Sequence, residues 1–205
     1  MIRQCGQKAL ARSLWAIAAA LTILTGCSGE HEWNGKDISG LMPELAFNLT
    51  NSEGNRYRPE DDAGQLRIMF FGFTNCPDVC PATMAQLSNA VSSMPERFHD
   101  DVTILFVSVD PKRDTPEKLN EYVNFFGDNI KGLTADEKTL RQLAKRYRTT
   151  FGYGEPDEHG NYDVSHSSAV YVFDPRGKAR LLLRTQLSTD AIRQDLTALA
   201  RQTLN

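Results

Sequence analysis

The sequence predicts an α/β domain in which a central mixed sheet is flanked by helices. Two continuous apolar runs, at 66–73 and 102–109, have the composition of strands that are buried on both faces. Apolar residues at helical spacing follow each run, and the chain closes with a two-strand hairpin and an amphipathic helix. Strands that alternate with helices and end in a ββα unit are typical of layered α/β folds.

The individual elements follow in a regular order. A β-hairpin that turns at 52–55 precedes the two buried strands, and a last hairpin turns at 174–177. Four helices are expected, after Pro81, from the N-cap Thr115, over 136–148 and from the N-cap Ser188. The polar stretch 152–166 is expected to be a long loop. This order is that of the thioredoxin fold, with an N-terminal β-hairpin and one extra helix.

The N-terminal segment has the pattern of a bacterial export signal. Its positive charges precede an apolar run at 14–24, and no acidic residue occurs before Glu30. The run is roughly half of the ~20 residues that a membrane-spanning helix needs, so it matches the apolar core of a signal peptide. It ends in the letters LTGC at 24–27, which resemble the lipobox of bacterial lipoproteins.

The lipobox resemblance implies cleavage before Cys27 and acylation of its sulfur and amine. An ordinary signal peptide with an incidental cysteine and an uncleaved anchor are the alternatives. Several acyl chains hold a protein stably on a membrane, whereas a single chain does so only marginally. We therefore expect a signal peptide at 1–26, a lipidated cysteine with a flexible tether at 27–40, and the folded domain at 41–205. The expected location is the periplasmic side of a bacterial membrane, with the inner membrane favoured.

Charge and composition exclude one class of partner. Acidic residues outnumber basic ones by 26 to 23, and the charges are scattered along the chain. Nucleic-acid binding depends on concentrated positive charge. The sequence therefore gives no indication of a nucleic-acid partner.

Removal of the leader leaves two thiols, Cys76 and Cys80. Because the periplasm is oxidising, such a pair is a structural disulfide, a redox-active couple or a metal site. A disulfide that closes so small a loop would restrict the unfolded chain little. The expected helix N-terminus favours thiolates there. Two soft thiolates, spaced more widely than Cys-x-x-Cys, suit a soft ion such as Cu(I), which would require a third donor.

Histidine is the obvious third donor, and His166 is the candidate among four. His166 directly precedes the strand SAVYVF. In thioredoxin-like folds a cis-proline occupies that entrance and faces the cysteine pair, but this chain has no proline between Pro156 and Pro175. The remaining three histidines are expected at the surface, namely His31, His99 and His159.

Three further residues near the cysteine pair have two interpretations each. Asp110 ends the second buried strand and either supports the cysteines from behind or starts a turn with Pro111. Asp78 lies between the cysteines and is expected to cap the helix rather than to face a partner. Met84 continues an apolar helical series, so we expect it to pack in the core rather than to bind Cu(I).

Three sequence blocks resemble the signature blocks of the Sco/SenC family. They read GFTNCPDVCP, VSVDPKRDTPEKLNEY and YDVSHSSAVYVFDPRG, in that order. The family consists of membrane-tethered, thioredoxin-like copper proteins that help to assemble the copper sites of cytochrome c oxidase. The resemblance implies that Cys76, Cys80 and His166 are copper ligands. Many family members have an acidic residue just before the histidine, whereas this chain has Ser165.

The leading functional hypothesis is a copper chaperone that is not itself an enzyme. Its expected partners are the copper-receiving subunit of cytochrome c oxidase and a further periplasmic copper chaperone or thiol reductant. The alternative is a thiol–disulfide oxidoreductase in which Cys76 and Cys80 form the redox-active pair. His166 distinguishes the two, because a metal site needs it and disulfide exchange does not. A peroxidase is disfavoured, because its Thr-x-x-Cys spacing does not match Thr74 and Cys76.

Overall fold

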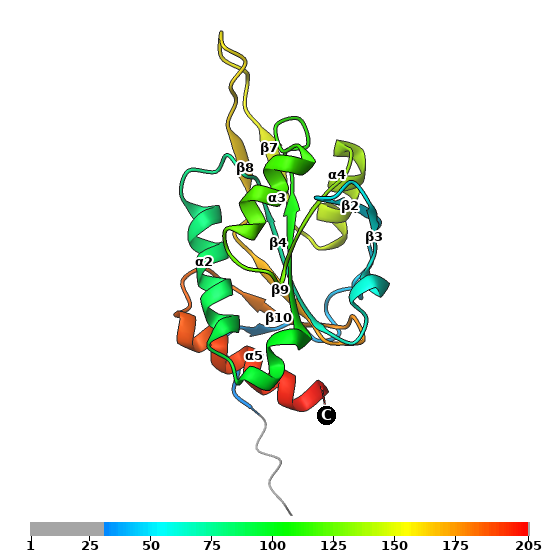
Figure 1. Ribbon diagram of the computed structural model, residues 1–205, viewed down its shortest axis with the longest axis vertical. Coiled ribbons are helices and arrows are strands. Elements are labelled where there is room, and N and C mark those ends of the chain that lie inside the picture. Colours follow the sequence, from blue (N-terminus) through cyan, green and yellow to red (C-terminus); the bar gives the residue numbers. More distant parts are fainter. Residues whose placement is uncertain (1–30, 205) are drawn as a thin grey trace, which may run out of the picture. The chain divides into compact units, whose positions relative to one another are not determined.

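An eight-stranded mixed sheet forms the centre of the folded unit (Figure 1). The computed structural model describes residues 31–204, so the predicted signal peptide and Cys27 lie outside the described residues. Three central strands run parallel: β4 (Leu66–Gly72), β5 (Val102–Ser108) and β6 (Ile130–Thr134). Antiparallel strands extend the sheet on both sides, so that the order is β1-β10-β9-β4-β5-β6-β2-β3.

Helices cover both faces of this sheet and create two apolar layers. One layer joins the even-numbered side chains of β4 to helices α2 (Val79–Ser92), α3 (Pro116–Asn124) and α5 (Thr189–Thr203). The other layer joins the odd-numbered side chains of β4 to helix α4 (Glu137–Arg146). The alternation along β4 is what a strand buried on both faces requires.

Most of the predicted order is confirmed. The N-terminal hairpin consists of β2 (Leu49–Asn51) and β3 (Arg56–Tyr57), and the C-terminal one of β9 (Val170–Phe173) and β10 (Ala179–Leu183). Thr115 and Ser188 cap their helices, because each side-chain oxygen accepts a bond from a first-turn N–H. The described residues also form two 3₁₀ helices, at Pro59–Asp62 and Glu96–Asp101. The thioredoxin-like arrangement is therefore present, with its N-terminal hairpin and additional helix.

The strand β6 was not predicted from the sequence. Its apolar run is interrupted by Lys131 and Gly132, so neither a continuous nor an alternating pattern is visible. The glycine is required by packing, since a Cβ atom there would lie 2.6 Å from the Leu119 side chain of α3. Strand β6 also carries the N-terminal hairpin, because β2 pairs with it.

The prediction of a loop at 152–166 is wrong at its two ends, which form strands, whereas residues 154–163 between them contain no helix or strand. Strands β7 (Phe151–Tyr153) and β8 (Val164–His166) pair antiparallel and form a separate two-stranded ribbon. This ribbon extends beyond the end of the central sheet (Figure 1). At its tip Asp157 accepts backbone bonds from His159 and Asn161. The polar composition of the tip concealed the two short strands.

The folded unit also begins earlier than the predicted boundary at residue 41. Strand β1 (Lys36–Asp37) pairs with β10 inside the segment predicted to be a tether. The carboxylate of Asp195 in α5 accepts the backbone N–H groups of Asn34 at 3.0 Å and Gly35 at 2.7 Å. The contiguous unit accordingly starts at Trp33. Among the described residues, no helix combines the length and apolar character needed to cross a bilayer.

Candidate metal centre

The turn between β4 and α2 places the two cysteines. Cys80 lies in the first turn of α2 and is fully buried, whereas Cys76 is partly buried. The Cys76 sulfur accepts the Cys80 backbone N–H at 3.4 Å, so one unpaired donor of the helix N-terminus points at it. Gly72 makes room for this arrangement, because a Cβ atom there would lie 2.9 Å from the Cys80 sulfur.

His166 ends β8 and faces the buried cysteine. Its Nε2 atom lies 3.2 Å from the Cys80 sulfur, and its Nδ1 atom lies 3.0 Å from the carbonyl oxygen of Ser167. A carbonyl oxygen only accepts, so Nδ1 carries the proton and the Nε2 lone pair points toward the sulfur. The imidazole also packs edge-on against Phe70 and Phe73, at ring-centre distances of 5.8 and 5.6 Å.

The three predicted ligands come together. The sulfurs of Cys76 and Cys80 and a ring nitrogen of His166 all lie within 4.8 Å of one another. Bonds of about 2.0–2.3 Å to nitrogen and sulfur separate neighbouring ligands of one ion by about 4 Å. Two thiolates and one imidazole therefore fit a single soft ion here with little rearrangement.

Burial controls protonation at the two inner ligands. Desolvation raises the pKa of the Cys80 thiol, and the charges of Cys76 and Asp114 raise it further. Desolvation lowers the pKa of His166, which keeps its imidazole neutral. We expected the helix N-terminus to favour thiolates, but at Cys80 burial is the stronger influence. An arriving ion must therefore displace the Cys80 proton, while His166 is ready to bind.

The carboxylate beside the cysteine loop belongs to Asp114 and not to Asp110, for which the turn interpretation holds, because the Asp110 carbonyl oxygen accepts the N–H groups of Arg113 at 3.2 Å and Asp114 at 3.0 Å. Asp110 is fully buried, but it accepts bonds from Arg113 Nε at 2.5 Å and from the Tyr162 hydroxyl at 2.6 Å rather than from a ligand. Asp114 instead accepts the N–H of Thr74 at 2.9 Å and its hydroxyl at 2.6 Å. It thereby ties the cysteine loop to the end of β5, where the Ser108 hydroxyl also bonds to it.

Sequence reasoning missed Asp114, although it stands in the same block as Asp110. Asp114 directly follows Arg113, and nothing in the neighbouring sequence indicates that its side chain contacts Thr74. Asp78 occupies the N-cap position of α2 but makes no capping bond through its side chain, so that expectation is wrong. Met84, a residue of α2, is fully buried in the core, as expected.

The fold and the three converging ligands define a class, that of thioredoxin-like domains with a two-thiol, one-imidazole metal centre. A family model described as SCO1/SenC matches residues 41–201 of the chain. The chain therefore belongs to the SCO1/SenC family, which confirms the resemblance of the three sequence blocks.

Individual relatives agree with this assignment. The human "Protein SCO1 homolog, mitochondrial" is 37% identical over 133 residues, which are 64% of this chain and 44% of that protein. The chain thus spans less than half the length of that relative. The structure of ScoI from Arabidopsis thaliana "with copper bound" superposes with a TM-score of 0.72 at 31% identity, covering 78% of this chain and 98% of the other.

A bacterial structure extends the comparison. The "SCO1/SenC family lipoprotein" from Bacillus anthracis has a TM-score of 0.67 at 25% identity, and the match covers 82% of this chain and 99% of that one. The common fold is thus found in relatives from plants and bacteria.

Proposed function

We propose that this protein is a membrane-tethered copper chaperone for the copper site of cytochrome c oxidase. Cys76, Cys80 and His166 would hold the copper. The observation that carries the proposal is the bare Nε2 of His166, 3.2 Å from the Cys80 sulfur. Disulfide exchange has no need of a ring nitrogen in that position. The copper bound by ScoI from Arabidopsis thaliana, whose fold this chain shares, supports the choice of ion.

The ligands differ in a way that suits uptake and release. Cys80 is fully buried, whereas the partly buried Cys76 is accessible to a ligand of another protein. A hollow of about 440 Å³ borders the cysteine loop at Thr74 and Asn75. A three-ligand site leaves room for an incoming ligand, so copper can pass through a shared arrangement. Loss of the Cys80 proton on binding should make copper affinity rise with pH.

The decisive experiment removes the imidazole and keeps both thiols. We expect His166→Ala to lose the cysteine-to-Cu(II) charge-transfer absorption and to keep weaker, two-sulfur Cu(I) binding. Cys76→Ser and Cys80→Ser should each abolish tight copper binding. In cells that depend on this protein for oxidase assembly at low copper, His166→Ala should fail like a deletion. Full rescue by His166→Ala would contradict the chaperone proposal.

A second function has one specific observation in its favour. The Cys80 backbone N–H points at the sulfur of Cys76, the more accessible of the two sulfurs, which is where disulfide exchange would begin. Attack on a partner disulfide would form a mixed disulfide. Cys80, as thiolate, would then resolve it, so that the partner gains two thiols and this protein one disulfide. A His166→Ala protein that still reduces the oxidase cysteines and restores assembly would favour this reductase.

We also propose that residues 1–26 are removed and that Cys27 is acylated. The charged start, the short apolar run and the lipobox support this, and so does the description of the Bacillus anthracis relative as a lipoprotein. The acyl chains would hold the domain on the periplasmic side of the inner membrane. Mass spectrometry of the membrane fraction should find an N-terminal peptide that starts with acylated Cys27. A mature protein that retains residues 1–26 would contradict this.

A further inference from the structure

We infer that Arg113 is a positioning residue that, by clamping Tyr162, holds the β7–β8 ribbon so that His166 stays opposite Cys80. The inference deepens the proposed function, because it concerns the retention of the third copper ligand. It rests on contacts among the protein's own side chains, so it can be tested whether or not copper binds.

The ribbon requires such a clamp because the central sheet does not hold it. Strands β7 and β8 pair only with each other among the described residues, in a register that sets His166 opposite Phe151. No ladder of backbone bonds therefore fixes the distance between His166 and Cys80. The link 167–169 joins His166 to β9, and side-chain contacts must hold the rest of the ribbon in place.

Arg113 contacts the ribbon in two ways at once. Its guanidinium carbon lies 3.9 Å from the ring centre of Tyr162, and its Nη1 donates to the Tyr162 carbonyl oxygen at 3.0 Å. Its Nε donates to the fully buried Asp110 at 2.5 Å, which fixes the guanidinium plane. A planar group with several donors can stack and donate together, whereas a lysine ammonium cannot. The side chain is only 22% exposed, so water weakens these contacts little.

Tyrosines on both sides of the ribbon complete the clamp. The Tyr162 hydroxyl donates to Asp110 at 2.6 Å, and the Tyr162 ring packs edge-on against Tyr153 at 5.7 Å. The Tyr153 hydroxyl donates to the carbonyl of Val109 at 2.5 Å. Tyr153 is the register partner of Val164, two residues before His166. Both strands are thus attached to the segment that follows β5.

Arg113 also acts on the imidazole of His166 indirectly, through the ring of Phe73. The Arg113 guanidinium lies 5.9 Å from the ring centre of Phe73, and that ring packs edge-on against His166. Phe73 belongs to the cysteine loop, so Arg113 stands between the two halves of the centre. Its loss should leave His166 free to move relative to Cys80 without removing any ligand.

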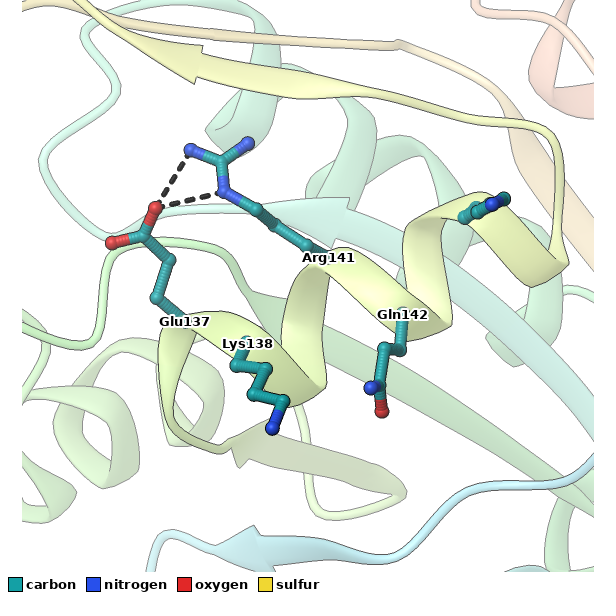
Figure 2. Close-up of a pocket in the computed structure, with 5 residues that line it drawn as sticks. Glu137, Lys138, Arg141 and Gln142 are labelled. Atoms are coloured by element: carbon teal, nitrogen blue, oxygen red, sulfur yellow. Dashed lines mark hydrogen bonds and ion pairs between the residues drawn. The ribbon is translucent and has the colours of Figure 1, made fainter.

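A second arginine, Arg141, makes contacts of the same kind with the ribbon, since its Nη1 donates to the Phe151 carbonyl oxygen at 3.4 Å, but its side chain is more exposed than that of Arg113. Arg141 of α4 packs against Phe151 and Tyr153, at 4.7 and 5.6 Å from their ring centres. Figure 2 shows its guanidinium bonded to the Glu137 carboxylate on the same helix, and both side chains are nearly half exposed. Exposed pairs of this kind contribute little. Arg141 therefore does not replace Arg113.

The first test uses the metal-free, reduced protein and the proton resonance of the His166 Cε1–H group. Phe70 and Phe73 shift that resonance through their ring currents, whereas the exposed His159 provides a solvent reference. We expect Arg113→Ala to move the His166 resonance at least halfway toward that of His159. Arg97→Ala is the matched control, because it removes an arginine stacked 4.6 Å from Phe98 and leaves the ribbon untouched. An unmoved resonance in Arg113→Ala overturns the inference.

The second test is a double-mutant cycle on Cu(I) affinity. Arg113→Ala should weaken binding at least tenfold when His166 is present and less than twofold in a His166→Ala background. Equal losses in both backgrounds would show that Arg113 acts elsewhere and would overturn the inference. A wild-type protein that binds no copper would instead refute the proposed function, and the resonance test would still decide the role of Arg113.

Arg113→Lys provides a variant that keeps the charge beside Asp110, in case the alanine protein does not fold. Lysine can preserve the ion pair but not the combined stack and carbonyl bond. We expect an intermediate shift of the His166 resonance and an intermediate affinity. A lysine variant that matches the wild type in both measurements would overturn the role of the guanidinium.

Discussion

The two halves of the metal centre are built in opposite ways. Cys80 lies in the core at the start of α2 and next to the parallel strand β4, which is buried along its whole length. His166 lies on a ribbon that is outside the central sheet and is attached by side chains. The cysteine half is therefore rigid with the fold, whereas the histidine half depends on a few contacts. A site of this construction can lose one ligand without unfolding.

The largest expected effect comes from disturbing the rigid half at Asp114. Asp114→Ala leaves the Thr74 and Ser108 donors without their acceptor in a buried place, at a cost of about 3 kcal/mol in the free energy of unfolding. Urea denaturation of the reduced protein measures it. Asp190→Ala, which breaks an exposed pair with Arg193, should change stability by less than about 0.5 kcal/mol. Similar values for both variants would contradict the picture of a rigid cysteine half.

Gly72→Ala should cause the next largest loss of stability. The added Cβ would lie 2.6 Å from the Phe106 ring and 2.9 Å from the Cys80 sulfur, and neither neighbour is at a flexible end. Overpacking of this kind costs about 1–3 kcal/mol, and here it should also displace Cys80 and weaken copper binding. In the control Gly154→Ala the new atom meets its nearest neighbour at 3.5 Å, which is ordinary contact. Thermal unfolding that leaves both variants like the wild type would refute the close approach.

The ribbon should respond more mildly, and in function more than in stability. Tyr153→Phe removes only the hydroxyl bond to Val109, which is worth about 1 kcal/mol. We expect a small loss of stability but a measurable rise in the rate of copper release, because the histidine half is loosened. Stopped-flow transfer to a chelator measures that rate. A release rate equal to the wild type, with the expected loss of stability, would separate the ribbon from copper retention.

The pH dependence of stability in the metal-free protein should separate the two halves of the centre. Because burial lowers the pKa of His166, its contribution to stability is present above its ordinary value of about 6.5 and is lost as the pH falls. Because burial raises the pKa of Cys80, its contribution is present below about 8.5 and is lost as the pH rises. His166→Gln should flatten only the acid side and Cys80→Ser only the alkaline side of the stability curve. A variant that flattens the opposite side would contradict this assignment.

The sequence was sufficient to predict most of the cysteine half of the centre, but little of what attaches the histidine half to the fold. Long apolar runs predict β4 and β5, and the missing proline together with the resemblance to the Sco/SenC family predicts His166 as the third ligand. Strand β6 was not predicted because Lys131 and Gly132 interrupt its apolar pattern. Its identity as a strand depends on the neighbours with which it pairs. The ribbon was missed because each of its strands has only three residues, which are too few to show a periodic pattern.

The carboxylates illustrate a different limit. Asp110 and Asp114 stand four positions apart in one polar turn, and nothing local distinguishes them. Their partners come from distant segments, Tyr162 for one and Thr74 for the other. Asp78 shows the same limit, because its place at a helix start predicted a cap that the Cys76 sulfur in part provides.

The early start of the folded unit determines how far the domain can travel. With Cys27 acylated as proposed, only the peptide between it and Asn34, which Asp195 fastens to α5, can extend. Seven residues of fully extended chain span at most about 25 Å. A tether that continued to residue 40 would almost double this radius. Such a short tether would keep the folded unit near the membrane, so that the protein could serve only clients whose receiving site lies close to the same bilayer surface.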